Sequence, residues 1–315
     1  MASIFLALAL LVCIWMFLIA PGRSTEQQRH PFEKRTFAHR GLYTEDQRIP
    51  ENSLPAFDAA VQAGYGIELD VQLTKDKQVV VFHDDTLQRV CGVDARVDAL
   101  SLEELRRLSL CGTNHRIPLF EDVLQLIDGR VPLIVELKSS GDRLGNCERT
   151  RALLRAYKGD YCVESFHPGV VRWFRINAPE VLRGQLSEAY RYSSKSVSAH
   201  VALGMSRLLT NCTTRPQFIA YRIGPKCLSV RAAEWMGAMR VSWTARPEHN
   251  WHMLKRCTDG IIFEYMRPET RFDTEKSSLE QVMDQIDTEL KTGQSTCNSF
   301  LSGKEKDNCG KHPTT

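Results

Sequence analysis

The feature that most constrains this chain is a regular alternation of short strand-like runs with segments of helical periodicity. Alternating strands and helices joined by short connectors favour a parallel sheet covered by helices. Eight strands spread over about 230 residues suit a closed (β/α)8 barrel better than an open sheet. The predicted runs are Arg35–Ala38, Gly66–Val71 with a continuation through Val79–Phe82, Leu133–Leu137, Tyr161–Ser165, Val181–Leu186, Phe218–Ile223, Arg240–Thr244 and Gly260–Phe263.

The segments between these runs repeat apolar residues at helical spacing. Leu54, Phe57 and Val61 fall on one face of a helix. Ser53 directly precedes them and is a residue type that caps helix N-termini. The same spacing recurs at residues 170–174 and again before Gly237, so we expect helices to cover the barrel.

The ends of the chain depart from the alternation and suggest four regions. We expect a transmembrane anchor at residues 1–22, a linker at 23–34 and the catalytic barrel at 35–272. Residues 273–315 are expected to form a helix followed by a disordered tail, because the last part is polar and nearly free of apolar residues.

The predicted anchor is the stretch from Ile4 to Ala20, which contains no charged residue. Its length is near the short limit for crossing a hydrocarbon layer of ~30 Å. Basic residues follow it, beginning with Arg23, whereas none precedes it. The positive-inside rule therefore predicts a single-pass membrane protein with a cytoplasmic catalytic domain. A cleaved signal peptide and an exported protein are the alternative.

Charge and cysteine content exclude several classes of protein. The chain has 41 Lys+Arg and 38 Asp+Glu, a net charge of +3. This balance argues against a nucleic-acid partner, since phosphate neutralisation requires a strongly basic face. The ten cysteines form no C-x-x-C pair and no Cys/His grouping, so neither a structural zinc site nor a disulfide framework is indicated.

Titratable residues gather at the predicted ends of the early strands. In a (β/α)8 barrel the chemistry lies at the C-terminal ends of the strands, so these residues are the candidate site. They are His39, Arg40, Glu68, Asp70, His83, Glu136 and Lys138, with Glu51 in the loop after the first strand.

Three of these residues form a candidate metal site. Glu68 and Asp70 are two positions apart, so on a strand both carboxylates point to the same side. Two like charges on a buried face are costly unless a cation lies between them. Glu136 on the next strand supplies a third oxygen ligand. An all-oxygen site without Cys or a His pair favours Mg²⁺ or Ca²⁺ over zinc.

The remaining residues suit a phosphate ester. Lys138 is two positions after Glu136 and points into the same space, where its ammonium would suit an anion. Arg40 adds a planar fork for phosphate oxygens. His39 and His83 are suited to general base and general acid catalysis near neutral pH. Taken singly, Lys138 also fits an ordinary strand-end cation.

Five motifs occur in one order, and together they resemble the glycerophosphodiester phosphodiesterase family. Weaker similarity, at Ser-Phe and Trp-Thr pairs, extends along the rest of the barrel. The five motifs are His39-Arg40-Gly41, Pro50-Glu51-Asn52-Ser53, Glu68-Leu69-Asp70-Val71, Val81-Phe82-His83-Asp84 and Val135-Glu136-Leu137-Lys138.

The resemblance implies a TIM barrel that hydrolyses glycerophosphodiesters to glycerol 3-phosphate and an alcohol with the help of a divalent metal. It implies a small-molecule substrate. By motif position it implies metal ligands Glu68, Asp70 and Glu136, an acid/base pair His39 and His83, phosphate contacts Arg40 and Lys138, and a supporting acid, Glu51.

The chain departs from the family pattern at the end of its eighth strand. The family usually has Thr-Asp there, whereas this chain has Phe263-Glu264, so Glu264 could take the place of the acid. His167 stands where an acid or amide is common. These differences affect the expected range of substrates more than the expected reaction.

Two alternatives to a glycerophosphodiesterase are open from the sequence. A lysophospholipase-D-type enzyme would need an apolar path to the site. Candidate residues for that path are Trp173, Tyr190, Tyr192 and Trp235. A catalytically silent, membrane-tethered binding barrel is less favoured, because every expected catalytic group is present.

Overall fold

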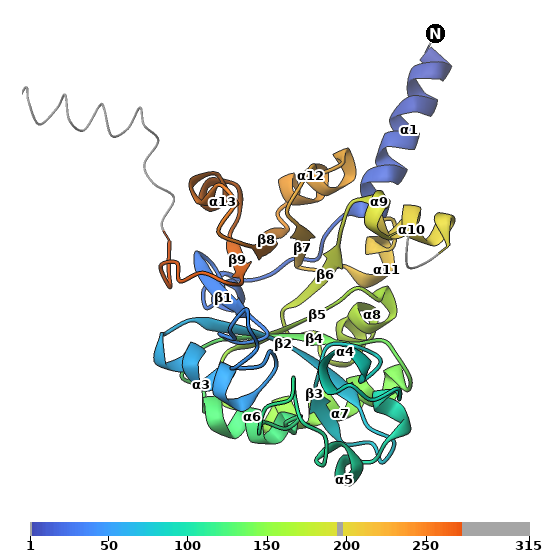
Figure 1. The fold of residues 1–315 in the computed structure, drawn as a ribbon. Helices are drawn as coiled ribbons and strands as arrows, with labels where there is room; N and C mark the ends of the chain where they lie inside the picture. Colours follow the sequence, from blue (N-terminus) through green and yellow to red (C-terminus); the bar gives the residue numbers. More distant parts are fainter. Residues whose placement is uncertain (1, 194–197, 273–315) are drawn as a thin grey trace, which may run out of the picture. The chain divides into compact units, whose positions relative to one another are not determined.

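The computed structural model describes residues 2–193 and 198–272 and contains a closed barrel (Figure 1). Eight parallel strands pair in the order β1-β2-β4-β5-β6-β7-β8-β9, and β9 pairs with β1. The expected (β/α)8 architecture is confirmed. The predicted helix and tail at 273–315 lie outside the described residues. The strands are β1 (Arg35–His39), β2 (Gly66–Leu73), β4 (Leu133–Leu137), β5 (Tyr161–Ser165), β6 (Arg183–Ser187), β7 (Phe218–Arg222), β8 (Met239–Ala245) and β9 (Gly260–Phe263).

Strand alternation divides the barrel interior into an apolar and a polar zone. Phe37, Ile134 and Cys162 belong to a buried cluster inside the barrel. Two positions further along each of these strands the residue is polar, as at His39 and Glu136. Because side chains two apart share a face, these polar groups lie directly above the apolar layer, toward the C-terminal ends of the strands.

The run Val79–Phe82 does not continue the second barrel strand, as the sequence had suggested. Residues Val79–Val81 form a separate strand, β3, which pairs antiparallel with β2. The chain reverses in a turn where the Thr74 amide donates to the Gln78 carbonyl at 3.0 Å. The returning segment runs back along β2, and the Phe82 amide donates to the Asp70 carbonyl.

The helices between the strands match the predicted periodic segments. Ser53 caps α3 by accepting from the Ala56 amide, and α8 begins at Pro168. The main helices are α3 (Leu54–Gln62), α6 (Phe120–Ile127), α7 (Arg143–Ala156), α8 (Pro168–Asn177), α12 (Leu228–Trp235) and α13 (Trp251–Cys257). The remaining helices in the described part of the chain, apart from the N-terminal one, are α2 (Glu26–Arg29), α4 (Gln88–Cys91), η1 (Val97–Ala99), α5 (Leu102–Leu105), α9 (Tyr190–Ser193), α10 (Ala199–Ser206) and α11 (Asn211–Thr214).

The N-terminal segment forms helix α1 (Ala2–Ile19), whose C-terminal end is held by the barrel. The Asn211 side chain donates to the Ile19 carbonyl and Arg215 donates to the Ala20 carbonyl, both at 2.9 Å. The 18 residues of α1 rise about 27 Å, less than the ~30 Å hydrocarbon layer. Among the described residues, no helix combines the length and the apolar character needed to cross a bilayer, so the expected transmembrane anchor is not supported.

Candidate active site

The candidate site is a cavity of about 490 Å³ at the C-terminal ends of the barrel strands. Six of the predicted site residues line it, and Asp70 and Lys138 contact two of them. The structure therefore brings all eight predicted residues together. The six lining residues are His39, Arg40, Glu51, Glu68, His83 and Glu136.

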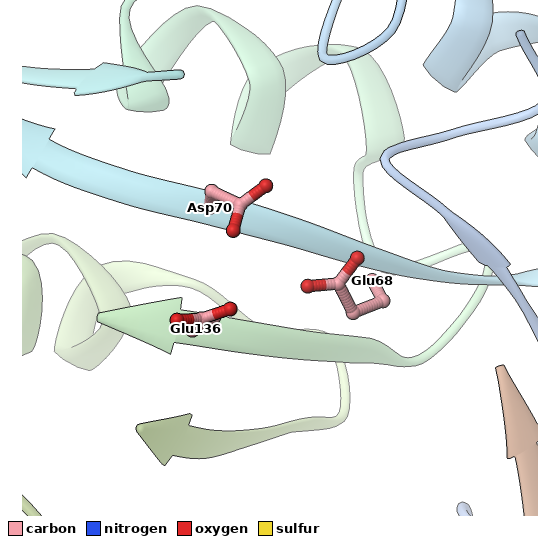
Figure 2. Close-up of side chains that lie close together, drawn as sticks. All are labelled: Glu68, Asp70 and Glu136. Carbon is pink, nitrogen blue, oxygen red and sulfur yellow. The ribbon is translucent and has the colours of Figure 1, made fainter. Parts of the chain in front are cut away.

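The three predicted metal ligands form a compact buried cluster (Figure 2). Ligand oxygens of Glu68, Asp70 and Glu136 all lie within 4.8 Å of one another. Burial raises the pKa of Glu68 well above its ordinary value, and the neighbouring Asp70 carboxylate raises it further. Such crowding of buried negative charge would be relieved by a cation, and an all-carboxylate donor set fits a hard divalent ion. These residues could therefore hold a divalent metal.

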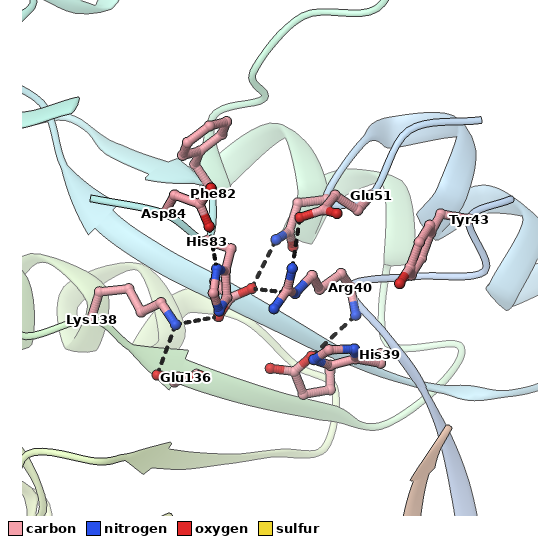
Figure 3. Close-up of polar contacts among 12 residues, drawn as sticks. His39, Arg40, Tyr43, Glu51, Phe82, His83, Asp84, Glu136 and Lys138 are labelled. Carbon is pink, nitrogen blue, oxygen red and sulfur yellow. Dashed lines mark hydrogen bonds and ion pairs between the residues drawn. The ribbon is translucent and has the colours of Figure 1, made fainter. Parts of the chain in front are cut away.

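Two cations, Lys138 and Arg40, lie against Asp70. Lys138 Nζ is 3.0 Å from Asp70 Oδ1 and 3.0 Å from Glu136 Oε1. Figure 3 shows the contact between Lys138 and Glu136. Arg40 Nε lies 3.6 Å from Asp70 Oδ2. Burial alone would raise the pKa of Asp70, but these cations hold it well below its ordinary value. Lys138 is therefore part of the cluster rather than an isolated strand-end cation.

The His39-Arg40-Gly41 motif forms a tight turn that directs Arg40 into the cluster. Arg40 and Gly41 have positive φ angles of 54° and 82°. A Cβ on Gly41 would lie 2.9 Å from Ala56 backbone and side-chain atoms, so glycine is required there. The turn lets the Arg40 amide donate to Glu68 Oε2 at 3.1 Å while its guanidinium donates to Glu51 Oε1 at 2.7 Å.

The two histidines have the same arrangement although they come from different kinds of segment. His39 Nδ1 lies 2.8 Å from Glu264 Oε2, and His83 Nδ1 lies 2.6 Å from Asp84 Oδ1. Burial raises the pKa of Glu264, but His39, Tyr43 and Arg246 together lower it to about 2, and His83 and Arg89 likewise lower the pKa of Asp84. Because Arg246 and Arg89 favour the ionised carboxylates independently of the histidines, both carboxylates accept these bonds. Each Nδ1 therefore donates, which leaves Nε2 as the ring atom without a hydrogen bond among the described residues.

The tight turn after β1 and the segment after β3 are joined by a residue that the sequence did not single out. Arg89 on α4 donates to Glu51 Oε1 and Oε2 at 2.6 and 3.0 Å, and to Asp84 Oδ2 at 2.6 Å. It thereby links the carboxylate that holds Arg40 to the one that holds His83. No local sequence signal marks this role, because α4 lies in the long connection before α6.

The unusual acid at the end of β9 is also tied into the site. Glu264 accepts from Tyr43 Oη at 2.8 Å and from Arg246 Nε at 2.5 Å, in addition to His39. Glu264 thus fixes the ring of His39. The other departure, His167, caps α8 by accepting from the Gly169 amide at 2.9 Å.

The opposite side of the cavity is formed by aromatic rings covered by arginine. The Arg222 guanidinium lies 4.1 Å from the Tyr192 ring centroid and 6.0 Å from that of Trp243. Its ion-pair partner is Glu188, at 3.5 Å. We call Tyr192, Arg222 and Trp243 the rim.

Of the four aromatic residues suggested for an apolar path, only Tyr192 lines this cavity. Trp173 packs against Phe174 with ring centroids 5.0 Å apart. Tyr190 on α9 and Trp235 on α12 are solvent-exposed. An apolar path would therefore have to use other residues.

Comparisons with known proteins agree with this geometry. A sequence profile of the Glycerophosphoryl diester phosphodiesterase family matches residues 39–267. A glycerophosphodiester phosphodiesterase of Caldanaerobacter subterraneus is 32% identical over 250 residues, covering 74% of this chain and 94% of the relative. A rat lysophospholipase D is 32% identical over 164 residues, covering 48% of this chain and 50% of the relative.

Other relatives are covered less completely. The chain spans 62% and 64% of the length of two Bacillus relatives that are 37% and 35% identical.

A phosphodiesterase of Oleispira antarctica, solved in complex with the product sn-glycerol-3-phosphate, superposes with a TM-score of 0.57 at 21% identity. It covers 73% of this chain and 93% of its own, and at this identity it shows the shared fold. Together, the profile match and the Caldanaerobacter relative show that the chain belongs to the glycerophosphoryl diester phosphodiesterase family.

Proposed function

We propose that this protein hydrolyses glycerophosphodiesters to glycerol 3-phosphate and an alcohol, using a divalent metal. The observation that carries this proposal is the pair of histidines whose Nδ1 atoms are held by Glu264 and Asp84. Both line the same cavity as the carboxylate cluster. Family membership supports the same reaction.

The histidines would carry the proton transfers. The Nε2 of one neutral histidine accepts a proton from the attacking water as its oxygen bonds to phosphorus, and the other histidine, protonated at Nε2, donates a proton to the alcohol oxygen as its P–O bond breaks. Glu264 and Asp84 fix the tautomer and the ring orientation, as a carboxylate behind a catalytic histidine does in other hydrolases. His39 Nε2 lies 3.9 Å from Glu68 Oε2, so this ring lies beside the proposed metal site.

The phosphate would be held by Lys138 and Arg40. Lys138 is held by Asp70 and Glu136, and Arg40 by Glu51 and Asp70, and each retains donors beyond those contacts. Mg²⁺ or Ca²⁺ bound by Glu68, Asp70 and Glu136 would add positive charge where the phosphoryl oxygens become more negative. Glu51 supports this arrangement through Arg40 and Arg89.

A direct assay tests the proposal. The purified chain is supplied with Mg²⁺ or Ca²⁺ and with glycerophosphocholine, glycerophosphoethanolamine, glycerophosphoserine or glycerophosphoglycerol, and glycerol 3-phosphate is measured. The His39→Ala variant serves as the control for contaminating activity. Release of glycerol 3-phosphate by the wild-type chain alone is expected. No release from any diester with either metal would contradict the proposal.

A lysophospholipase-D-type activity is the second candidate. One relative carries that name, and the cavity has an apolar side formed by Phe166, Leu186 and Ile223. A lysolipid acyl chain would need such a surface. Comparing choline release from glycerophosphocholine and from lysophosphatidylcholine decides between the two activities. A higher kcat/KM for the lysolipid would favour the second candidate.

We further propose that the protein is attached to a membrane through residues 1–22, with the barrel on the cytoplasmic side. Large apolar side chains of α1 such as Phe5, Leu6 and Phe17 are more than 60% exposed. A contiguous exposed apolar surface is typical of a membrane or protein contact. The full chain should sediment with membranes in high salt, and deletion of residues 1–22 should release it. Release of the full chain by salt would contradict the proposal.

A further inference from the structure

A fourth carboxylate lies beside the three-carboxylate cluster. Glu164 on β5 is aligned with Glu136 on the neighbouring strand β4. It is two positions after Cys162, which packs inside the barrel, so its side chain also points inward. Glu164 lines the same cavity as Glu68 and Glu136, yet its exposed fraction is only 1%.

Within the described residues, the buried carboxylate of Glu164 lacks the ion pairs and hydrogen bonds that balance the charge of its neighbours. Its Oε2 atom is buried and has no hydrogen-bond partner among the residues that the structure describes. Asp70 and Glu136 are each contacted by Lys138, and Glu68 accepts from the Arg40 amide. A buried carboxylate without a partner is strongly disfavoured, and such an atom in a native structure usually has an ion or a ligand as its partner.

The net charge around the cluster is negative and would be balanced by a divalent ion. The three clustered carboxylates Glu68, Asp70 and Glu136, together with the neighbouring Glu164, carry four negative charges when ionised. The basic side chains that contact them by ion pairs, in the described part of the chain, are Lys138, Arg40 and His39. Arg40 is shared with Glu51 and His39 with Glu264. When all four are ionised, at least two of these negative charges have no cationic partner of their own among the described residues, and two charges are what one divalent metal ion supplies.

We propose that Glu164 is a fourth carboxylate ligand of the metal ion bound by Glu68, Asp70 and Glu136. The inference rests on the proposed metal-dependent function and extends its ligand set to β5. An additional protein oxygen favours Ca²⁺, which takes six to eight oxygen ligands, over Mg²⁺, which usually retains several waters. Glu164 thereby gives the site a preference for the larger ion.

Two substitutions test the ligand role by metal binding, without any activity measurement. Glu164→Gln keeps the shape of the side chain and removes its charge. Glu164→Asp keeps the charge and withdraws the oxygens by one carbon from a position fixed on a strand. Binding of Ca²⁺ and Mg²⁺ to the full chain is measured by isothermal titration calorimetry. Asp58→Asn, at an exposed position on α3, is the control for loss of one negative charge.

The ligand role predicts distinct results for each variant. Glu164→Gln should weaken Ca²⁺ binding at least ~10-fold, as even outer-shell changes weaken metal sites by 10–100-fold. Mg²⁺ binding should weaken less, and Asp58→Asn should bind both ions like the wild type. Glu164→Asp should also bind Ca²⁺ several-fold more weakly than the wild type.

Several outcomes would overturn the assignment. Unchanged Ca²⁺ affinity in Glu164→Gln would make Glu164 a structural residue, and full affinity in Glu164→Asp would leave only a charge effect. Thermal melting without metal guards against misfolding: Glu164→Gln should melt no lower than the wild type, because a buried charge is removed. Metal binding by a wild-type chain that cleaves no diester would refute the proposed function and leave the ligand assignment standing.

Discussion

The two halves of the barrel mouth differ in charge and in exposure. Strands β2 and β4 bring together the buried carboxylates Glu68 and Asp70 and the partly buried Lys138, which directly follows β4 and pairs with Asp70. Strands β7 and β8 contribute Arg222 and Trp243 to the half-exposed rim. Glu264, directly after β9, connects the halves, because it holds His39 on one side and Arg246 on the other.

This difference indicates a division of labour. Buried charges interact strongly and move little, which suits bond breaking at a fixed phosphate. Half-exposed guanidinium and aromatic groups are screened by water and contribute less energy to each contact. We therefore expect changes in the first half to affect kcat and changes in the rim to affect the choice of alcohol.

Removal of the metal from the first half should reduce the rate of hydrolysis more than any other change. Chelation with EDTA should lower hydrolysis by about 10³-fold or more, since the charge of a bound ion stabilises the transition state by several kcal/mol. Adding Mg²⁺ or Ca²⁺ should restore activity. Rates of glycerol 3-phosphate release before and after chelation measure the effect. Full activity after exhaustive chelation would refute the metal assignment.

Loss of either histidine should have the next largest effect. His39→Ala and His83→Ala should each lower kcat by ~10²–10⁴, the usual contribution of a positioned proton-transfer group. The melting temperature should change little, because both residues lie at the cavity rather than in the apolar clusters. A loss of less than tenfold in either variant would remove that residue from the acid/base pair.

Substitution of the two cations of the first half, Lys138 and Arg40, should have the third largest effect on activity. Lys138→Met keeps the length of the side chain and removes the charge, and it should lower kcat by roughly 10–100-fold, the value of a hydrogen bond to a charged group. Arg40→Lys keeps the charge but loses the two-pronged fork, so it should also lower kcat. Steady-state kinetics with one diester measure both. A kcat/KM within a few-fold of wild type for Lys138→Met would make it a structural cation.

The rim should show the smallest effect, and only in substrate choice. Arg222 covers the rings of Tyr192 and Trp243, so Arg222→Gln should free these faces for a quaternary ammonium. The kcat/KM for glycerophosphocholine relative to glycerophosphoglycerol should rise by about 2–5-fold, the value of one exposed cation–π contact. A fall in the kcat of Arg222→Gln as large as that of His39→Ala would contradict the proposed difference in role between the two halves.

The same comparison explains what could be predicted from the sequence. Side-chain alternation along a strand is a local property, so the i, i+2 spacing of Glu68 and Asp70 and of Glu136 and Lys138 indicated shared faces. The eight-strand count and the helix capped by Ser53 followed from local periodicity and are confirmed. The antiparallel turn that forms β3 was missed, because a short apolar run does not reveal its direction.

The sequence by itself determined the barrel, the carboxylate cluster and the identity of both histidines, because strand periodicity and residue chemistry act over a few positions. Only the tertiary structure decided which carboxylate holds each histidine, that Arg89 joins Glu51 to Asp84, and that Glu164 faces the cluster. Except for the contact between the adjacent residues His83 and Asp84, these contacts join residues from different segments, such as His39 and Glu264, which are 225 positions apart. Their geometry depends on barrel closure, which sets the neighbours of every strand end through the parallel register.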